Sequence, residues 1–107
     1  MKTPSDFVIS AHAYARLQER GIDKSVLWAA RRQAIRSNLA DHLLDQQKKF
    51  SQMLSENDLH VRVGQREYVV STKAIATRLD IEGVTLAVGI KREGEGYTPL
   101  TVTTAWN

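Results

Sequence analysis

The sequence contains no cysteine, and this absence excludes several classes of protein at once. A chain without thiols cannot form a disulfide scaffold, a thiolate zinc site, an iron–sulfur cluster or a cysteine nucleophile. No stretch approaches roughly 18 uninterrupted apolar residues, and the first ten residues hold no apolar run long enough for a signal peptide. We therefore expect a protein that neither spans a membrane nor is exported, with a reducing, cytoplasmic location.

Proline and glycine are also scarce, with 2 and 6 residues, and they fall mainly in the second half of the chain. No internal repeat or low-complexity segment is present. With 107 residues, of which 42% are hydrophobic and 25% charged, the chain has enough apolar side chains for one small core. We expect a single domain over residues 1–107.

Positive charge is concentrated in the first half of the chain. Residues 1–54 hold nine Lys and Arg against five Asp and Glu, whereas residues 55–107 hold six against seven, giving the net charge of +3. A basic half suggests a polyanionic partner such as a nucleic acid. An Arg-rich solvated helix face explains the same distribution.

Helical periodicity dominates the first half. Ser10 is a natural N-cap, and a helix from Ala11 to Arg20 would end at Gly21. A second helix, capped by Asp23, has one apolar stripe, and the stripe changes phase near Ser37-Asn38. We predict a break there, supported by an Asn38/Asp41 capping pair, and a third helix from about Leu39 to Leu54; one long helix with contacts on two sides is the alternative.

The second half has the two-residue period of β-strands. A hairpin is predicted around Gly64-Gln65, a central strand from Val84 to Ile90, and a last strand that begins at Leu100 and ends at Trp106. Residues 73–80 favour strand or loop over helix, and residues 7–9 fit either an edge strand or the end of the first helix. The predicted fold is α+β, with two or three helices (about 10–55) packed on a curved antiparallel sheet of about four strands (about 59–106).

His12 is the first candidate for chemistry, because an imidazole exchanges protons near neutral pH. Arg16 lies one helical turn further on and Arg20 two turns further, so the three side chains share one face. An imidazole beside two guanidinium groups suits a phosphodiester, since cleavage needs proton transfer and stabilisation of negative charge on phosphorus. Glu19 can orient the ring or act as base. The alternative is that these residues only form surface pairs on the helix.

The predicted sheet offers a second wall for such a cleft. Thr101 and Thr103 project from one face of the last strand, and Lys91 and Arg92 follow the central strand. Threonine is also common on half-exposed strands for its shape alone. Four aromatic residues are candidates for stacking on bases or for ordinary packing, namely Trp28, Tyr68, Tyr97 and Trp106.

The sequence carries no convincing cofactor or metal motif. His42 has one acidic neighbour at helical spacing, Asp45, and a single His-x-x-Asp pair is weak evidence for a metal site. Gly94-Glu95-Gly96 reads as a hairpin turn and not as a phosphate loop. We predict neither a cofactor nor a metal.

The stretch from Ser10 to Ile22 resembles the signature Ser-x-His-Ala-x-x-Arg-x-x-x-Arg-Gly-Ile of a small bacterial family of domains of unknown function. That family looks related to RelE/ParE/BrnT-type toxins and to the wider barnase/colicin-like ribonuclease fold. The resemblance implies that His12, Arg16 and Arg20 are the polar signature, with Thr101 or Thr103 as partners on the sheet.

Together these features predict a toxin-like endoribonuclease that cleaves RNA without a metal by transesterification. Its partners would be RNA and a protein inhibitor, either an antitoxin or an immunity protein, with no membrane contact. One alternative is a non-catalytic protein- or nucleic-acid-binding module of phage or mobile-element origin, which could form a homodimer through residues 39–54. Another is a nucleic-acid binder without turnover.

Overall fold

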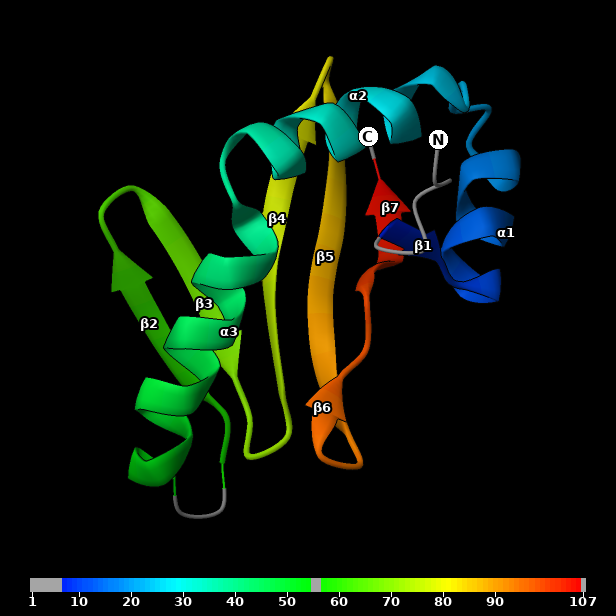
Figure 1. Cartoon of the computed structure of the whole chain (residues 1–107). Coiled ribbons are helices and arrows are strands. Elements are labelled where there is room, and N and C mark those ends of the chain that lie inside the picture. Colours follow the sequence, from blue (N-terminus) through cyan, green and yellow to red (C-terminus); the bar gives the residue numbers. More distant parts are fainter. Residues whose placement is uncertain (1–6, 55–56, 107) are drawn as a thin grey trace.

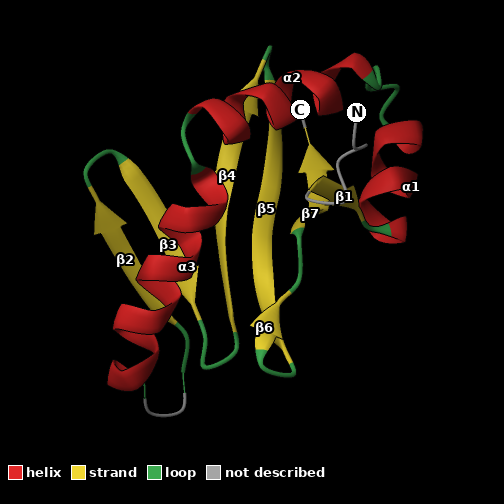
Figure 2. Ribbon diagram, in the orientation of Figure 1, coloured by secondary structure: helices red, strands yellow, loops and turns green. Residues whose placement is uncertain are grey.

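Three helices and a seven-stranded sheet form the fold (Figure 1). The computed structural model describes residues 7–54 and 57–106. The strand order is β1-β7-β5-β4-β3-β2, with β6 paired to β5 at one end. Helices α2 and α3 cross one face of the sheet, and α1 lies beside β7, as Figure 2 shows in the same view. The predicted α+β class with N-terminal helices is confirmed.

The three helices follow the predicted boundaries closely. They are α1 (Ala11–Glu19), α2 (Ser25–Arg36) and α3 (Leu39–Phe50), and a 3-10 turn, η1 (Ser51–Met53), continues α3. Ser10 caps α1 by accepting a hydrogen bond from the backbone N–H of Ala13 at 3.0 Å. The Asp23 carboxylate accepts one from the N–H of Ser25 at 2.9 Å.

The break between α2 and α3 lies where the change of apolar phase predicted it. Asn38 adopts a left-handed conformation with φ of 52°, which turns the chain between the two helices. Asn is one of the few residues that tolerate this conformation. The predicted capping pair between Asn38 and Asp41 is wrong, because the Asn38 side chain makes no capping hydrogen bond.

The sheet has more strands than the four predicted. The seven are β1 (Phe7–Ile9), β2 (Leu59–Val63), β3 (Arg66–Val70), β4 (Ala74–Ile81), β5 (Val84–Glu93), β6 (Gly96–Tyr97) and β7 (Leu100–Trp106). The ambiguous segment 73–80, predicted as strand or loop, is a strand from Ala74 onward. The two shortest strands, β1 and β6, are too short to show the two-residue period in the sequence. β1 pairs in parallel with β7, which is more than 90 residues away in the sequence.

The core lies between the sheet and the helices. Alternate residues of the strands point into it, including Leu86, Val88 and Val102, all of which are fully buried. Leu39 and Leu43 of α3 are buried against the same face, so these apolar residues pack inside their own chain. Dimerisation through residues 39–54 stays a prediction.

One buried polar side chain ties α3 to the sheet. Gln47 is 1% exposed, and its amide nitrogen donates to the carbonyl oxygens of Ser71 and Thr72 at 3.0 and 3.1 Å. The hydroxyl of Tyr97 donates to its amide oxygen. Gln47 therefore joins the end of α3 to the β3–β4 turn and to β6.

Replacing this amide should destabilise the protein. Gln47→Leu leaves several partly buried polar groups without partners, and we expect a loss of about 2–4 kcal/mol in the free energy of unfolding. Tyr97→Phe removes only one bond and should cost about 1 kcal/mol. Urea denaturation of the purified variants measures both.

The neighbouring Gln46 provides the matched control. Its side-chain oxygen is buried without a hydrogen-bond partner among the described residues, so Gln46→Leu should leave the stability unchanged or raise it. Equal losses in Gln47→Leu and Gln46→Leu would contradict a specific role for Gln47.

Candidate functional site

The three polar residues of α1 and its end line one cavity with the last strand. His12, Arg16 and Arg20 share a volume of about 480 Å³ with Thr104 and Trp106 of β7. Steps of four residues advance about 40° around a helix, so the three side chains form one stripe. Ala13 and Leu17, on the packed side of α1, are fully buried and hold the helix in place.

Helix α1 takes the place of a strand along the outer edge of β7. Strand β1 pairs only with Leu100 to Val102, so the rest of that edge lacks a strand partner among the described residues. The Ser10 hydroxyl donates to the carbonyl of Thr103 at 3.3 Å, and the Arg20 guanidinium donates to that of Ala105 at 3.0 Å. The two ends of α1 thus satisfy β7 carbonyls, and Arg20 is anchored at the cavity wall.

Arg16 and His12 are held more loosely. Arg16 forms an ion pair with Glu19 at 3.0 Å, and the two side chains are 40% and 60% exposed. Exposed pairs of this kind contribute at most about 1 kcal/mol, so Arg16 can exchange Glu19 for another anion at little cost. His12 is exposed on the surface and not sealed in the core.

The second wall predicted from the sequence lies elsewhere. Lys91 and Arg92 are near the far end of β5, where they pair with Ala74 and with Tyr97 of β6. The Thr101 hydroxyl donates to the carbonyl of Pro99 at 3.0 Å, and the Thr103 hydroxyl donates to that of Ala87 at 3.3 Å. None of these four side chains lines the cavity with His12.

A β-bulge explains why Thr104 lines the cavity. Val88 pairs with Val102 and Ala87 pairs with Thr104, so Thr103 is the extra residue on β7. An extra residue reverses the alternation beyond it. If the alternation ran unbroken from Leu100, Thr104 would lie on the buried face, and no sequence signal marks the bulge.

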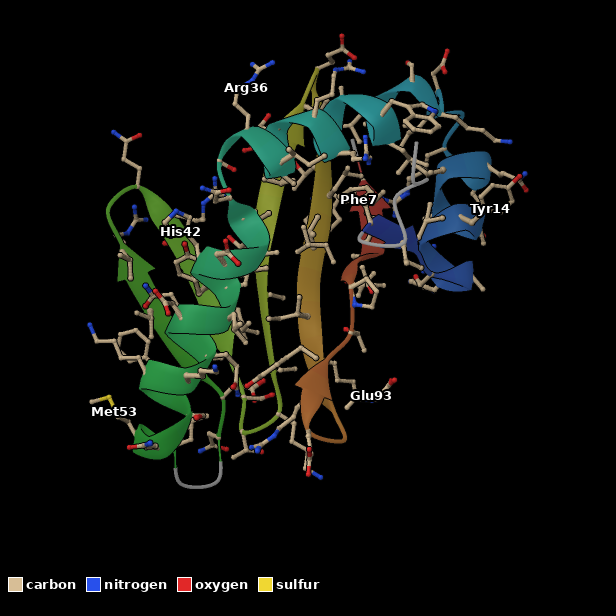
Figure 3. The ribbon with its side chains drawn as sticks, viewed as in Figure 1. Phe7, Tyr14, Arg36, His42, Met53 and Glu93 are labelled. Carbon is tan, nitrogen blue, oxygen red and sulfur yellow. The ribbon has the colours of Figure 1, made fainter. Side chains whose placement is uncertain are left out.

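A larger groove opens where β3 and β4 diverge. These strands pair only through Val69 with Ala76 and Val70 with Ile75, and Figure 1 shows them separating beyond that point. The groove has a volume of about 1110 Å³. Its lining mixes apolar side chains with charged and titratable ones, and the latter are Arg62, Arg66, Arg78, Glu67, Asp80, His42 and His60. Figure 3 shows His42 at the start of α3, beside the β2–β3 hairpin.

Trp106 joins the two hollows. Its ring lines both the cavity at α1 and the β3–β4 groove. The guanidinium of Arg78 lies over this ring, 5.3 Å from its centroid. Of the other three candidate aromatic residues, Tyr68 lines the groove but not the α1 cavity, and Trp28 and Tyr97 line neither. Trp106 is therefore the candidate aromatic residue that the structure brings to the site.

Comparisons with other proteins add no family to this picture. No family model, curated protein or solved structure matches the chain. The resemblance to toxin-type ribonucleases accordingly remains a prediction based on residues 10–22. Among the described residues, no helix is long and apolar enough to cross a membrane.

The different environments of the two arginines predict different effects on stability. Arg20→Met removes a charged donor from the Ala105 carbonyl, and we expect a loss of about 1–2 kcal/mol in the free energy of unfolding. Arg16→Met breaks only an exposed pair and should cost less than about 0.5 kcal/mol. Chemical denaturation compares them, and an equal cost for both variants would contradict the anchoring role of Arg20.

Proposed function

We propose that the protein is a cytoplasmic, toxin-like endoribonuclease that cleaves RNA by transesterification without a metal ion. The observation that carries this proposal is the shared cavity of His12, Arg16 and Arg20, in which an exposed imidazole lies with two guanidinium groups. Trp106, with its aromatic ring, completes the same cavity. Imidazole, guanidinium and an aromatic surface match the proton, the phosphate and the base of a ribonucleotide.

In the proposed reaction the 2′-oxygen of a ribose attacks the adjacent phosphorus, and the bond from phosphorus to the 5′-oxygen breaks. His12 accepts the proton of the 2′-hydroxyl and then releases it to solvent, while a water molecule protonates the departing 5′-oxygen on the opposite side of phosphorus. The products are a 2′,3′-cyclic phosphate and a free 5′-hydroxyl. The ring ends neutral, so the cycle needs no further co-reactant.

The two arginines stabilise the negative charge that builds up on the phosphoryl oxygens. A guanidinium has five N–H donors, and the bond to the Ala105 carbonyl uses one nitrogen of Arg20. Arg20 would therefore provide a fixed phosphate contact. Arg16 would leave Glu19 and close onto the phosphate when RNA binds.

Such an enzyme would need a protein inhibitor in its own cell. An antitoxin or immunity protein would most simply act by covering the cavity, with acidic side chains opposite Arg16 and Arg20. The alternative of a non-catalytic module predicts binding without product, and the following experiments separate the two.

Purified protein should cleave the dinucleotide UpA in the presence of EDTA. Removing the proton-transfer group in His12→Ala should lower the rate by about 10²–10⁴-fold. Gln18→Ala, an exposed residue of α1 outside the cavity, should retain the wild-type rate. Chromatography of the products detects the cyclic phosphate, and cleavage that disappears on chelation would overturn the metal-free mechanism.

Expression in a bacterium tests the toxin-like activity. The wild type should arrest growth, whereas His12→Ala, expressed to the same level, should not, because the damage depends on turnover. Growth curves and immunoblots of the two strains measure this. Equal harmlessness of both proteins would favour the binding module, and equal toxicity would exclude His12 chemistry as its cause.

A further inference from the structure

We infer that the β3–β4 groove is a second part of the RNA site, so that the substrate is a single strand of about four or more nucleotides. This inference rests on the proposed function, since it takes the bound polymer to be RNA. The cavity at α1 would hold the reacting phosphodiester, and the groove would bind the nucleotides next to it.

The first observation is the continuity of the two hollows. Trp106 lines both, and the guanidinium of Arg78 lies over its ring, 5.3 Å from the centroid. Thr104 pairs with Ala87, which in turn pairs with Arg78, so these residues form one row across β7, β5 and β4. The row lies on the face of the sheet opposite the buried Val88 and Leu79. A strand of RNA that leaves the cavity along this row meets the groove directly.

The second observation is the charge of the combined surface. The two hollows are lined by five arginines and two carboxylates: Arg16, Arg20, Arg62, Arg66 and Arg78, with Glu67 and Asp80. Glu67 is paired with Arg62, and the Asp80 carboxylate accepts a hydrogen bond from the Thr85 hydroxyl at 2.7 Å. Arg66 and Arg78 have no carboxylate within ion-pair distance among the described residues. Arg66 shares the face of the buried Tyr68 and Val70, and Arg78 lies on the opposite face, so the two guanidinium groups border the groove from its two sides. Both groups fit phosphates of a polyanion that passes between the diverging strands.

The third observation is an open backbone edge in the groove. The carbonyl of Lys73 accepts from the N–H of Arg92, which directs the odd-numbered residues of β4 toward β5. The N–H and C=O groups of Arg78 and Asp80 therefore point toward β3, which has already diverged. In the same gap the Thr77 hydroxyl donates to the Glu67 carbonyl at 2.7 Å, so a side chain links the two strands where their backbone pairing has ended. An extended peptide fits a free strand edge too, but the unpaired arginines favour RNA.

The spacing of the β-strands sets the length of the bound RNA. Neighbouring paired strands lie about 4.8 Å apart, so the two steps from β7 to β4 span roughly 10 Å, and the wider gap to the diverged β3 brings the path to at least about 15 Å. At about 3.4 Å per stacked nucleotide this distance corresponds to about four nucleotides. The bases must be unpaired, because stacking on Trp106 needs a free base face.

Oligouridylates with 2′-O-methyl riboses provide uncleavable probes. Fluorescence anisotropy with a labelled dimer, tetramer and octamer should show about tenfold or more tighter binding of the tetramer than of the dimer. The octamer should bind only slightly more tightly than the tetramer. A blunt-ended RNA duplex long enough to stay paired at the assay temperature should bind no better than the dimer.

The variant Arg66→Ala/Arg78→Ala should reduce the ratio of tetramer to dimer affinity to near one. It should also reduce the slope of log affinity against log salt for the tetramer by about 1.4, at about 0.7 per lost phosphate contact. The control Arg32→Ala/Arg36→Ala removes the same charge from exposed positions of α2, and Figure 3 shows Arg36 pointing away from the sheet. This control should keep the wild-type ratio. If the double variant does not fold, Arg66→Gln and Arg78→Gln are measured singly, and each should reduce the slope by about 0.7.

The outcomes separate this inference from the proposed function. If neither UpA nor an octamer with unmodified riboses is cleaved while the tetramer preference depends on Arg66 and Arg78, the cleavage proposal fails and the groove still binds RNA. If UpA is cleaved while the variant keeps the wild-type ratio, the groove inference is overturned. Duplex binding as tight as that of the tetramer, or displacement of the tetramer only by an acidic peptide, would also overturn it.

Discussion

The two-residue period of the sheet is the constraint on which the rest of the structure depends. Because α2 and α3 bury one face, every second residue from Ile75 to Ile81 of β4 and from Val84 to Val88 of β5 is buried, and all of these except Thr77 are apolar. The residues between them face the other side. Arg78 reaches the open face in this way. A change of register by one residue would bury that guanidinium and expose the core, so the folding of the helices onto the sheet also fixes the chemistry of the uncovered face.

Helix α1 couples the stability of the sheet edge to the candidate site. The outer edge of β7 would expose unpaired carbonyls beyond β1, and the two ends of the helix cover them with Ser10 and Arg20. The same anchoring brings His12 within the cavity that Trp106 completes. Arg20 therefore has two tasks, and a loss of function in an Arg20 variant would combine a structural effect with a chemical one.

The proposed division of the RNA site follows from two departures from a regular sheet. The bulge at Thr103 exposes Thr104 to the cavity, and the divergence of β3 from β4 opens the groove. Both leave backbone or side-chain groups without regular partners at the positions where a ligand can use them. A flat, fully paired sheet with the same residues would present neither hollow.

Local interactions explain what could be predicted from the sequence alone. Helices and strands formed where residues a few positions apart set the pattern. Examples are the caps at Ser10 and Asp23, the phase change at Asn38 and the alternation in β4 and β5. The common face of His12, Arg16 and Arg20 has the same local origin, because it needs only the helical period. Other features depend on segments far apart in the chain. These are the parallel pairing of β1, the bulge at Thr103, the divergence of β3 and the contact of Arg78 with Trp106. Only packing in three dimensions decided these features, since the free energy of each comes from partners that the local sequence does not contain.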